Sequence, residues 1–108
     1  MKSLSLREKD LAALRGTFSR FPSVTEVRLF GSRATGNARR ASDVDLAVFA
    51  PDATADEWAG LCEALEGTPI IYELDIVRAE RTANARLRER IEREGVQVYP
   101  AEHIDSAE

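Results

Sequence analysis

A chain of 108 residues is long enough for one domain with one hydrophobic core, and too short for two. Its 44% hydrophobic and 31% charged residues are typical of a soluble globular protein, and no apolar run approaches the roughly 20 residues that span a bilayer. The net charge of −4 argues against general nucleic-acid binding, so neither a membrane nor a nucleic acid is an expected partner.

The amino-terminal segment is too charged for a secretory signal, and the single cysteine, Cys62, cannot form an internal disulfide. These two features predict a protein of the reducing cytoplasm. Cys62 itself is most simply a small core residue.

Hydrophobic periodicity and turn residues divide the chain into alternating helices and strands. In chain order we expect a helix at 4–19, a strand at 24–30, a short helix or turn within 32–42, a strand at 43–49, a helix capped at 54 or 56 and ending at 67, a strand at 70–77, a helix at 82–94 and a strand at 96–99. This order predicts an α/β (α+β) fold in which helices pack on a small mixed sheet of three to four strands. Residues 1–100 would form the single domain, and residues 101–108 a frayed tail.

Asp43 and Asp45 open the second predicted strand and lie two residues apart. Side chains at this spacing point to the same face of a strand, so the two carboxylates would repel each other. A divalent cation such as Mg²⁺ would relieve this repulsion, because it prefers carboxylate oxygens and leaves positions open for phosphates. The pair alone also fits a solvated strand end or an Asx turn.

Two further features follow strands or lie within them. Gly31-Ser32 directly follows the first predicted strand, where it could form an anion site at a helix N-terminus or simply a serine cap after a tight turn. Asp75 lies between Leu74 and Ile76 in the third strand, which predicts either a metal ligand or a solvent-exposed face of the sheet.

Taken in order, these features resemble a known signature. The stretch from Gly31 to Leu46, GSRATGNARRASDVDL, resembles that of the polymerase-β-type nucleotidyltransferases, and most of all the minimal MNT-type proteins encoded beside HEPN-domain partners. The signature covers about 20 residues, and the order of predicted elements extends the resemblance over most of the chain. It implies a polymerase-β-like nucleotidyltransferase fold.

The resemblance also implies a role for each signature residue. Gly31 and Ser32 would hold the triphosphate of ATP, Asp43 and Asp45 would coordinate Mg²⁺, and Asp75 would be the third carboxylate, ligating the catalytic metal and helping to deprotonate the acceptor. Two metal ions would then stabilise the attacking and leaving oxygens during in-line attack on the α-phosphorus. Arg33 and Arg39 could contact the triphosphate or face solvent.

No acceptor-binding domain is expected within 108 residues. The resemblance instead implies a helical HEPN-type toxin as the partner. AMP would be transferred to a hydroxyl of this toxin, such as that of a tyrosine, so that the chain acts as an antitoxin. Two alternatives stay open: a binding module that neutralises its partner without catalysis, and transfer to a small molecule with the help of a partner subunit. A homodimer through an edge strand is also open.

The last stretch of the chain is rich in arginine. Arginines between residues 78 and 93 alternate with glutamates, which favours a salt-bridged, solvent-exposed helix face over a docking site for an acidic partner or a phosphate-bearing ligand.

Overall fold

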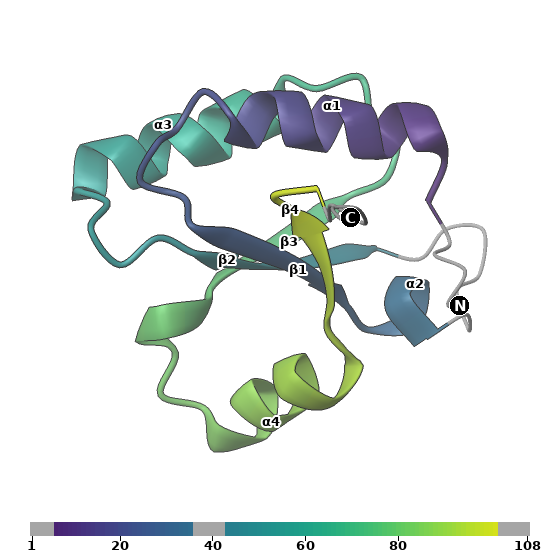
Figure 1. The fold of residues 1–108 in the computed structure, drawn as a ribbon, viewed down its shortest axis with the longest axis vertical. Coiled ribbons are helices and arrows are strands. Elements are labelled where there is room, and N and C mark those ends of the chain that lie inside the picture. Colours follow the sequence, from purple (N-terminus) through teal and green to yellow (C-terminus); the bar gives the residue numbers. More distant parts are fainter. Residues whose placement is uncertain (1–5, 36–42, 102–108) are drawn as a thin grey trace, which may run out of the picture.

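The computed structural model describes residues 6–35 and 43–101 and shows a mixed sheet between two layers of helices (Figure 1). Its elements in chain order are α1 (Glu8–Phe18), β1 (Glu26–Phe30), α2 (Ser32–Thr35), β2 (Val44–Phe49), α3 (Ala55–Glu66), β3 (Leu74–Arg78), the 3₁₀ helix η1 (Ala79–Arg81), α4 (Ala85–Glu94) and β4 (Val96–Tyr99). The predicted fold class and element order are confirmed. None of the described helices is long and apolar enough to cross a membrane.

The four strands lie in the order β3-β2-β1-β4. β1 is central and antiparallel to both neighbours, whereas β2 and β3 are parallel. A parallel pair needs a crossover connection, and α3 provides it.

The two faces of the sheet carry different apolar clusters. On one face Val27, Leu29, Val44, Leu46 and Val48 pack with residues of α1 and α3 in the larger core. On the other face a smaller cluster forms against α4 and η1, and its buried members are Phe30, Ala47, Ala79 and Ile91. Figure 1 shows this arrangement, with α1 and α3 together on one side of the sheet and α4 alone on the other. The second face therefore carries a smaller core than the first.

Helix ends follow local capping signals. α3 begins after Thr54, whose side chain accepts a hydrogen bond from the amide of Glu57, and Glu57 reciprocates at the amide of Thr54. This capping box satisfies two backbone donors, and it confirms Thr54 over Asp56 as the cap. Gly67 and Gly95 end α3 and α4, as predicted.

Three predicted starts were wrong by three or four residues, and the strand predicted from residue 24 begins at Glu26. The first helix begins at Glu8 rather than residue 4, and residues 1–5 lie outside the described part. The strand predicted at 70–77 begins only at Leu74, because β2 begins at its partner Val44 and the segment before Leu74 has no strand to pair with. The helix predicted from residue 82 begins at Ala85, because the Asn84 side chain caps it by accepting from the amide of Leu87 at 3.1 Å.

Arg78 was predicted to lie on an exposed arginine-rich face, but its side chain is largely buried. Its side chain is only 13% exposed, and its Nη2 donates to the carbonyls of Ala50 and Ala53 at 2.9 and 2.8 Å. Its Nε donates to Glu80 at 2.6 Å. Arg78 therefore joins the end of β3 to the loop between β2 and α3.

Candidate active site

Sheet register brings two of the predicted carboxylates together. Asp45 in β2 lies directly beside Asp75 in the parallel strand β3. The amide of Val44 donates to the carbonyl of Glu73 at 2.9 Å, which fixes the start of both strands at the same level. Asp43 immediately precedes β2, so all three aspartates lie at one end of the sheet, on the side of α2 (Figure 1).

These carboxylates lie on the face that α4 covers. Side chains alternate along a strand, and Asp45 therefore shares a face with Ala47 while Asp75 shares it with Val77. Ala47 and Val77 belong to the apolar cluster beneath α4. The carboxylates thus occupy the end of this face, next to the region that α4 buries.

Asp45 is half-buried, whereas Asp43 and Asp75 are exposed. Burial raises the pKa of the Asp45 carboxyl, and the neighbouring Asp75 and Asp43 raise it further, while the positive charge of Arg90 opposes them. The raised pKa of Asp45 therefore reflects burial first and the negative charge of the neighbouring carboxylates second. A bound cation would offset that negative charge.

The donor set suits a hard divalent cation such as Mg²⁺, since all three groups are carboxylates. Across the described residues, however, no three acidic, histidine or cysteine side chains converge closely enough to hold an ion as they stand. At least one of the aspartate side chains would have to turn for all three to bind the same ion.

Gly31 allows the chain to pass closely over Asp45. It lies at the end of β1, where Phe30 pairs with Asp45, and its φ of 79° is in the left-handed region that favours glycine. A Cβ atom at this position would collide with the carboxylate oxygen of Asp45 and would lie 3.5 Å from Nη2 of Arg90. The glycine of the signature is therefore required both by its backbone conformation and by the nearby carboxylate.

The backbone amide of Gly31 has a partner. It donates to Oε1 of Glu94 at 3.1 Å, and the same oxygen lies 3.5 Å from Nη2 of Arg90. Gly31 would thus accommodate a ligand through its small size rather than through this N–H. Ser32 begins α2, but its side chain, like residues 36–42 with Arg39, lies outside the described part.

Arg33 does not face solvent, so that alternative was wrong. The residue is 5% exposed, and its guanidinium carbon lies 3.9 Å from the ring centroid of Tyr72. This contact joins α2 to the segment that leads into β3.

Arg90 and Glu94 were not among the predicted site residues. Both lie on α4, in the segment predicted to be a salt-bridged solvent-exposed face, and the pairs Arg90–Glu94 and Arg93–Glu89 confirm that general prediction. What distinguishes Arg90 is its position beside Gly31 and Asp45, which lie 59 and 45 residues earlier in the chain. No local pattern in the sequence indicates this contact.

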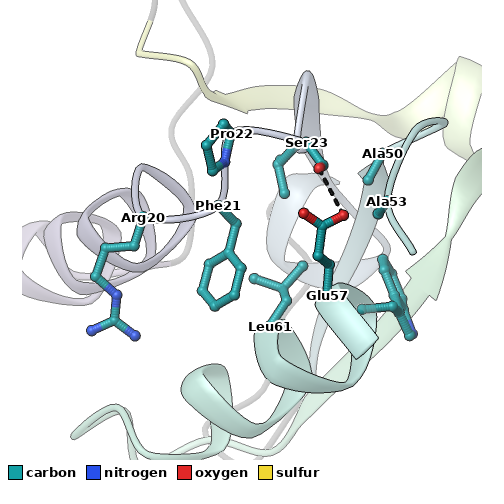
Figure 2. Close-up of a pocket in the computed structure, with 10 residues that line it drawn as sticks. Arg20, Phe21, Pro22, Ser23, Ala50, Ala53, Glu57 and Leu61 are labelled. Carbon is teal, nitrogen blue, oxygen red and sulfur yellow. Dashed lines mark hydrogen bonds between the residues drawn. The ribbon is translucent and has the colours of Figure 1, made fainter. Parts of the chain in front are cut away.

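A hollow at the other end of the sheet does not contribute to the carboxylate site. Figure 2 shows it between Phe21, Ala50, Ala53 and Leu61, with a volume of about 110 Å³. Its carboxylate, Glu57, has its pKa lowered by the hydrogen bonds from the Thr54 backbone and from Ser23, and so belongs to the α3 capping box. This hollow lies away from the three aspartates, and its one carboxylate is engaged in capping α3.

Comparisons with known proteins identify the family of the chain. A family profile described as polymerase beta, nucleotidyltransferase, matches residues 13–104. The chain is similar to a crystal structure of a toxin-antitoxin with AMP-PNP, with 24% identity, a TM-score of 0.61, and coverage of 94% of this chain and 79% of that one. No curated protein matches the chain significantly.

Two further solved structures are similar. The toxin-antitoxin MntA-HepT shares 19% identity at a TM-score of 0.58, over 86% of this chain and 72% of that one. A tyrosine-to-alanine variant of the same system shares 25% identity at a TM-score of 0.57, over 94% and 78%. Likeness at this level of identity supports the fold, and the family match covers most of the chain. The chain therefore belongs to the polymerase β nucleotidyltransferase family.

Proposed function

We propose that the chain is a Mg²⁺-dependent adenylyltransferase that moves AMP from ATP onto a hydroxyl group of a HEPN-type toxin protein and thereby acts as its antitoxin. The observation that carries the chemistry is the side-by-side placement of Asp45 and Asp75, with Asp43 close by and Gly31 passing over Asp45. The partner is suggested by the toxin-antitoxin structures to which the chain is similar.

Each residue would contribute a separate part of the reaction. Asp43, Asp45 and Asp75 would hold Mg²⁺, which neutralises phosphate charge and stabilises the attacking and leaving oxygens. The Gly31-Ser32 turn would receive the triphosphate, because glycine leaves room for close approach. Asp75 is exposed on an edge strand, where a hydroxyl of another protein can reach it.

The reaction is one displacement at the α-phosphorus. The acceptor oxygen forms a new bond to this phosphorus, the bond to the β-phosphate oxygen breaks, and pyrophosphate leaves. The proton of the acceptor hydroxyl would pass to the Asp75 carboxylate. The protein contributes mostly positioning and charge, which a small domain can supply.

Transfer is tested with the purified chain, Mg²⁺, ATP labelled at the α-phosphate and the protein encoded beside it. We expect label on that protein, detected by gel and located by mass spectrometry. The Asp45→Asn variant should reduce transfer by about a hundredfold or more. Asp52→Asn is the matched control, because it removes the same charge from an exposed turn after β2, away from the carboxylate end.

Other outcomes would contradict the proposal in different ways. Equal labelling by the wild type and Asp45→Asn would exclude the carboxylates from catalysis. Inhibition of the partner in a stable complex, without any label, would favour a non-catalytic binding module. Label on a small molecule alone would replace the protein acceptor.

A further inference from the structure

Arg90 lies on α4 at the border between the buried part of the sheet and the carboxylates. Its Nη2 atom lies 3.5 Å from the position that a Cβ of Gly31 would occupy, and the carboxylate of Asp45 lies against that same position. Arg90 therefore faces the turn and the carboxylate together. Figure 1 shows α4 on the side of the sheet opposite α1 and α3, and Gly31 lies between the end of β1 and the start of α2.

Two contacts hold the guanidinium in place. Its carbon lies 5.4 Å from the centroid of the Phe30 ring, and its Nη2 lies 3.5 Å from Oε1 of Glu94. Glu94 also accepts the amide of Gly31, so one carboxylate fixes both the turn and the arginine. These contacts orient Arg90, yet its side chain remains 45% exposed and can reach a ligand.

Arg93, on the same helix, provides a comparison for the exposure and the ion pairs of Arg90. It lies three residues further along, is 58% exposed, and pairs with Glu89 and Glu94 at 3.4 and 3.6 Å. The pair with Glu94 is made to Oε2, whereas the Gly31 amide donates to Oε1, and within the described part of the chain Arg93 has no contact of its own with Gly31 or Asp45. Arg90 shares the helix and the pairing with Glu94 but additionally faces Asp45.

We propose that Arg90 binds the triphosphate of the nucleotide, and that it holds the β- and γ-phosphates, which leave as pyrophosphate. This inference rests on the proposed nucleotidyltransferase function and adds to it a residue outside the sequence signature. Arginine suits the task, because its planar guanidinium presents several N–H donors to phosphate oxygens while one face can rest on an aromatic ring.

Binding of phosphate would require Arg90 to turn from Glu94 and Asp45 towards the phosphate oxygens, and the charges around Arg90 favour this change. In the structure its positive charge compensates part of the negative charge of Asp45. If Asp45 held a cation, its attraction for Arg90 would fall, and phosphate oxygens would be the stronger acceptors for the guanidinium. Glu94 would continue to hold the Gly31 turn, so the turn need not move when Arg90 changes partner.

The inference is tested by isothermal titration of the chain in Mg²⁺ with two ligands, α,β-methylene-ATP, which cannot transfer AMP, and AMP, which lacks the β- and γ-phosphates. Arg90→Gln should weaken binding of α,β-methylene-ATP by about tenfold, as expected for loss of a charged hydrogen bond, and leave AMP binding unchanged. Arg93→Gln, the matched control with the same charge change, should bind both ligands like the wild type. Arg90→Lys should restore part of the lost affinity, since it keeps the charge but not the planar group.

The outcomes separate this inference from the function on which it rests. If the wild type binds α,β-methylene-ATP and Arg90→Gln binds it equally well, or weakens both ligands equally, Arg90 does not bind the β- and γ-phosphates. A wild type that binds neither ligand would overturn the proposed function itself. Thermal unfolding of each variant tests whether it is folded. If Arg90→Gln does not fold, the affinities of Arg90→Lys and Arg93→Lys for the two ligands are compared instead.

Discussion

At the scale of single residues, Gly31 shows how backbone conformation and site chemistry coincide. The residue has a positive φ, and the carboxylate of Asp45 fills the space that a side chain would need. The sequence placed a glycine after a strand, which is compatible with many turns. Only the neighbouring strand β2 explains why no other residue fits here.

The Gly31→Ala variant should be destabilised by about 1–2 kcal/mol from the left-handed backbone alone, with a further loss from the collision with Asp45. Gly16→Ala is the control, because Gly16 lies in α1 with no atom near its would-be Cβ. It should be stabilised by about 0.5–1 kcal/mol, since alanine favours a helix interior. Urea unfolding of both variants measures the difference, and equal effects would contradict a special role for Gly31.

The aspartates were predictable as residues but not as an arrangement. Spacing along one strand placed Asp43 and Asp45 on the same face, Asp75 stood out between apolar residues of the third predicted strand, and the family resemblance implied its role as a third carboxylate. The parallel register that sets Asp75 beside Asp45 depends on how β3 pairs with β2. That pairing follows from the crossover through α3 and from packing of both strands against the larger core.

At the scale of elements, the contact between β3 and the loop before α3 depends on one ion pair. Glu80 accepts the amide of Ala50 at 3.0 Å and the guanidinium of Arg78 at 2.6 Å. Burial opposes ionisation of Glu80, but the Ala50 amide and Arg78 outweigh it and hold the pKa of this carboxyl below its usual value. Arg78 also lies over the Trp58 ring, 5.2 Å from its centroid, so the same contact reaches α3.

Replacing Glu80 by glutamine should therefore lower the free energy of unfolding by about 1–3 kcal/mol near neutral pH. A carboxyl whose pKa is lowered by folding stabilises the protein above its unfolded pKa of about 4.3, and that contribution disappears as the pH falls through the folded pKa. The difference between wild type and Glu80→Gln should accordingly be constant above about pH 5 and shrink below about pH 4.

The control for this experiment is Glu89→Gln, which removes a carboxylate that is 72% exposed and pairs with Arg93. An exposed pair contributes little, so this variant should change stability by less than about 0.5 kcal/mol. Denaturant unfolding at a series of pH values compares the two. A Glu80→Gln deficit that persists unchanged in acid would show that the ion pair is not its cause.

Element boundaries show where local signals suffice. The glycines after α3 and α4 and the Thr54 cap were found from the sequence, because capping is a contact between near neighbours. Asn84 carried the same kind of signal, and the helix predicted from residue 82 overlooked it. The start of β3 at Leu74 carried no local signal, because it depends on where β2 begins.

At the scale of the whole molecule, stability depends on the larger core against the central strand. Leu29 is fully buried in β1 between the sheet and the α1–α3 layer. Leu29→Ala should cost about 2–5 kcal/mol, a large part of the roughly 5–15 kcal/mol that a small domain has. Ile71→Ala is the control, because Ile71 is 75% exposed and should change stability by less than about 0.5 kcal/mol.

Thermal and urea unfolding of both variants test this expectation. A Leu29→Ala variant as stable as Ile71→Ala would mean that the core described around β1 does not limit stability. The comparison also separates variants that lose activity through unfolding from those that lose it at the carboxylates.

The sequence by itself determined the family, the fold class and the order of elements. These are encoded by short-range patterns, because strand alternation, helix periodicity, capping and the signature all involve residues within about 20 positions of one another. The sequence also led to the proposal that Asp43, Asp45 and Asp75 form the site. Tertiary structure alone decided which carboxylates lie together, that Arg33 is buried against Tyr72, and that Arg90 and Glu94 reach the Gly31 turn. These contacts join segments far apart in the chain. The pairing of β2 with β3 brings Asp75 beside Asp45, and the packing of α4 on the second face of the sheet brings Arg90 and Glu94 beside the end of β1.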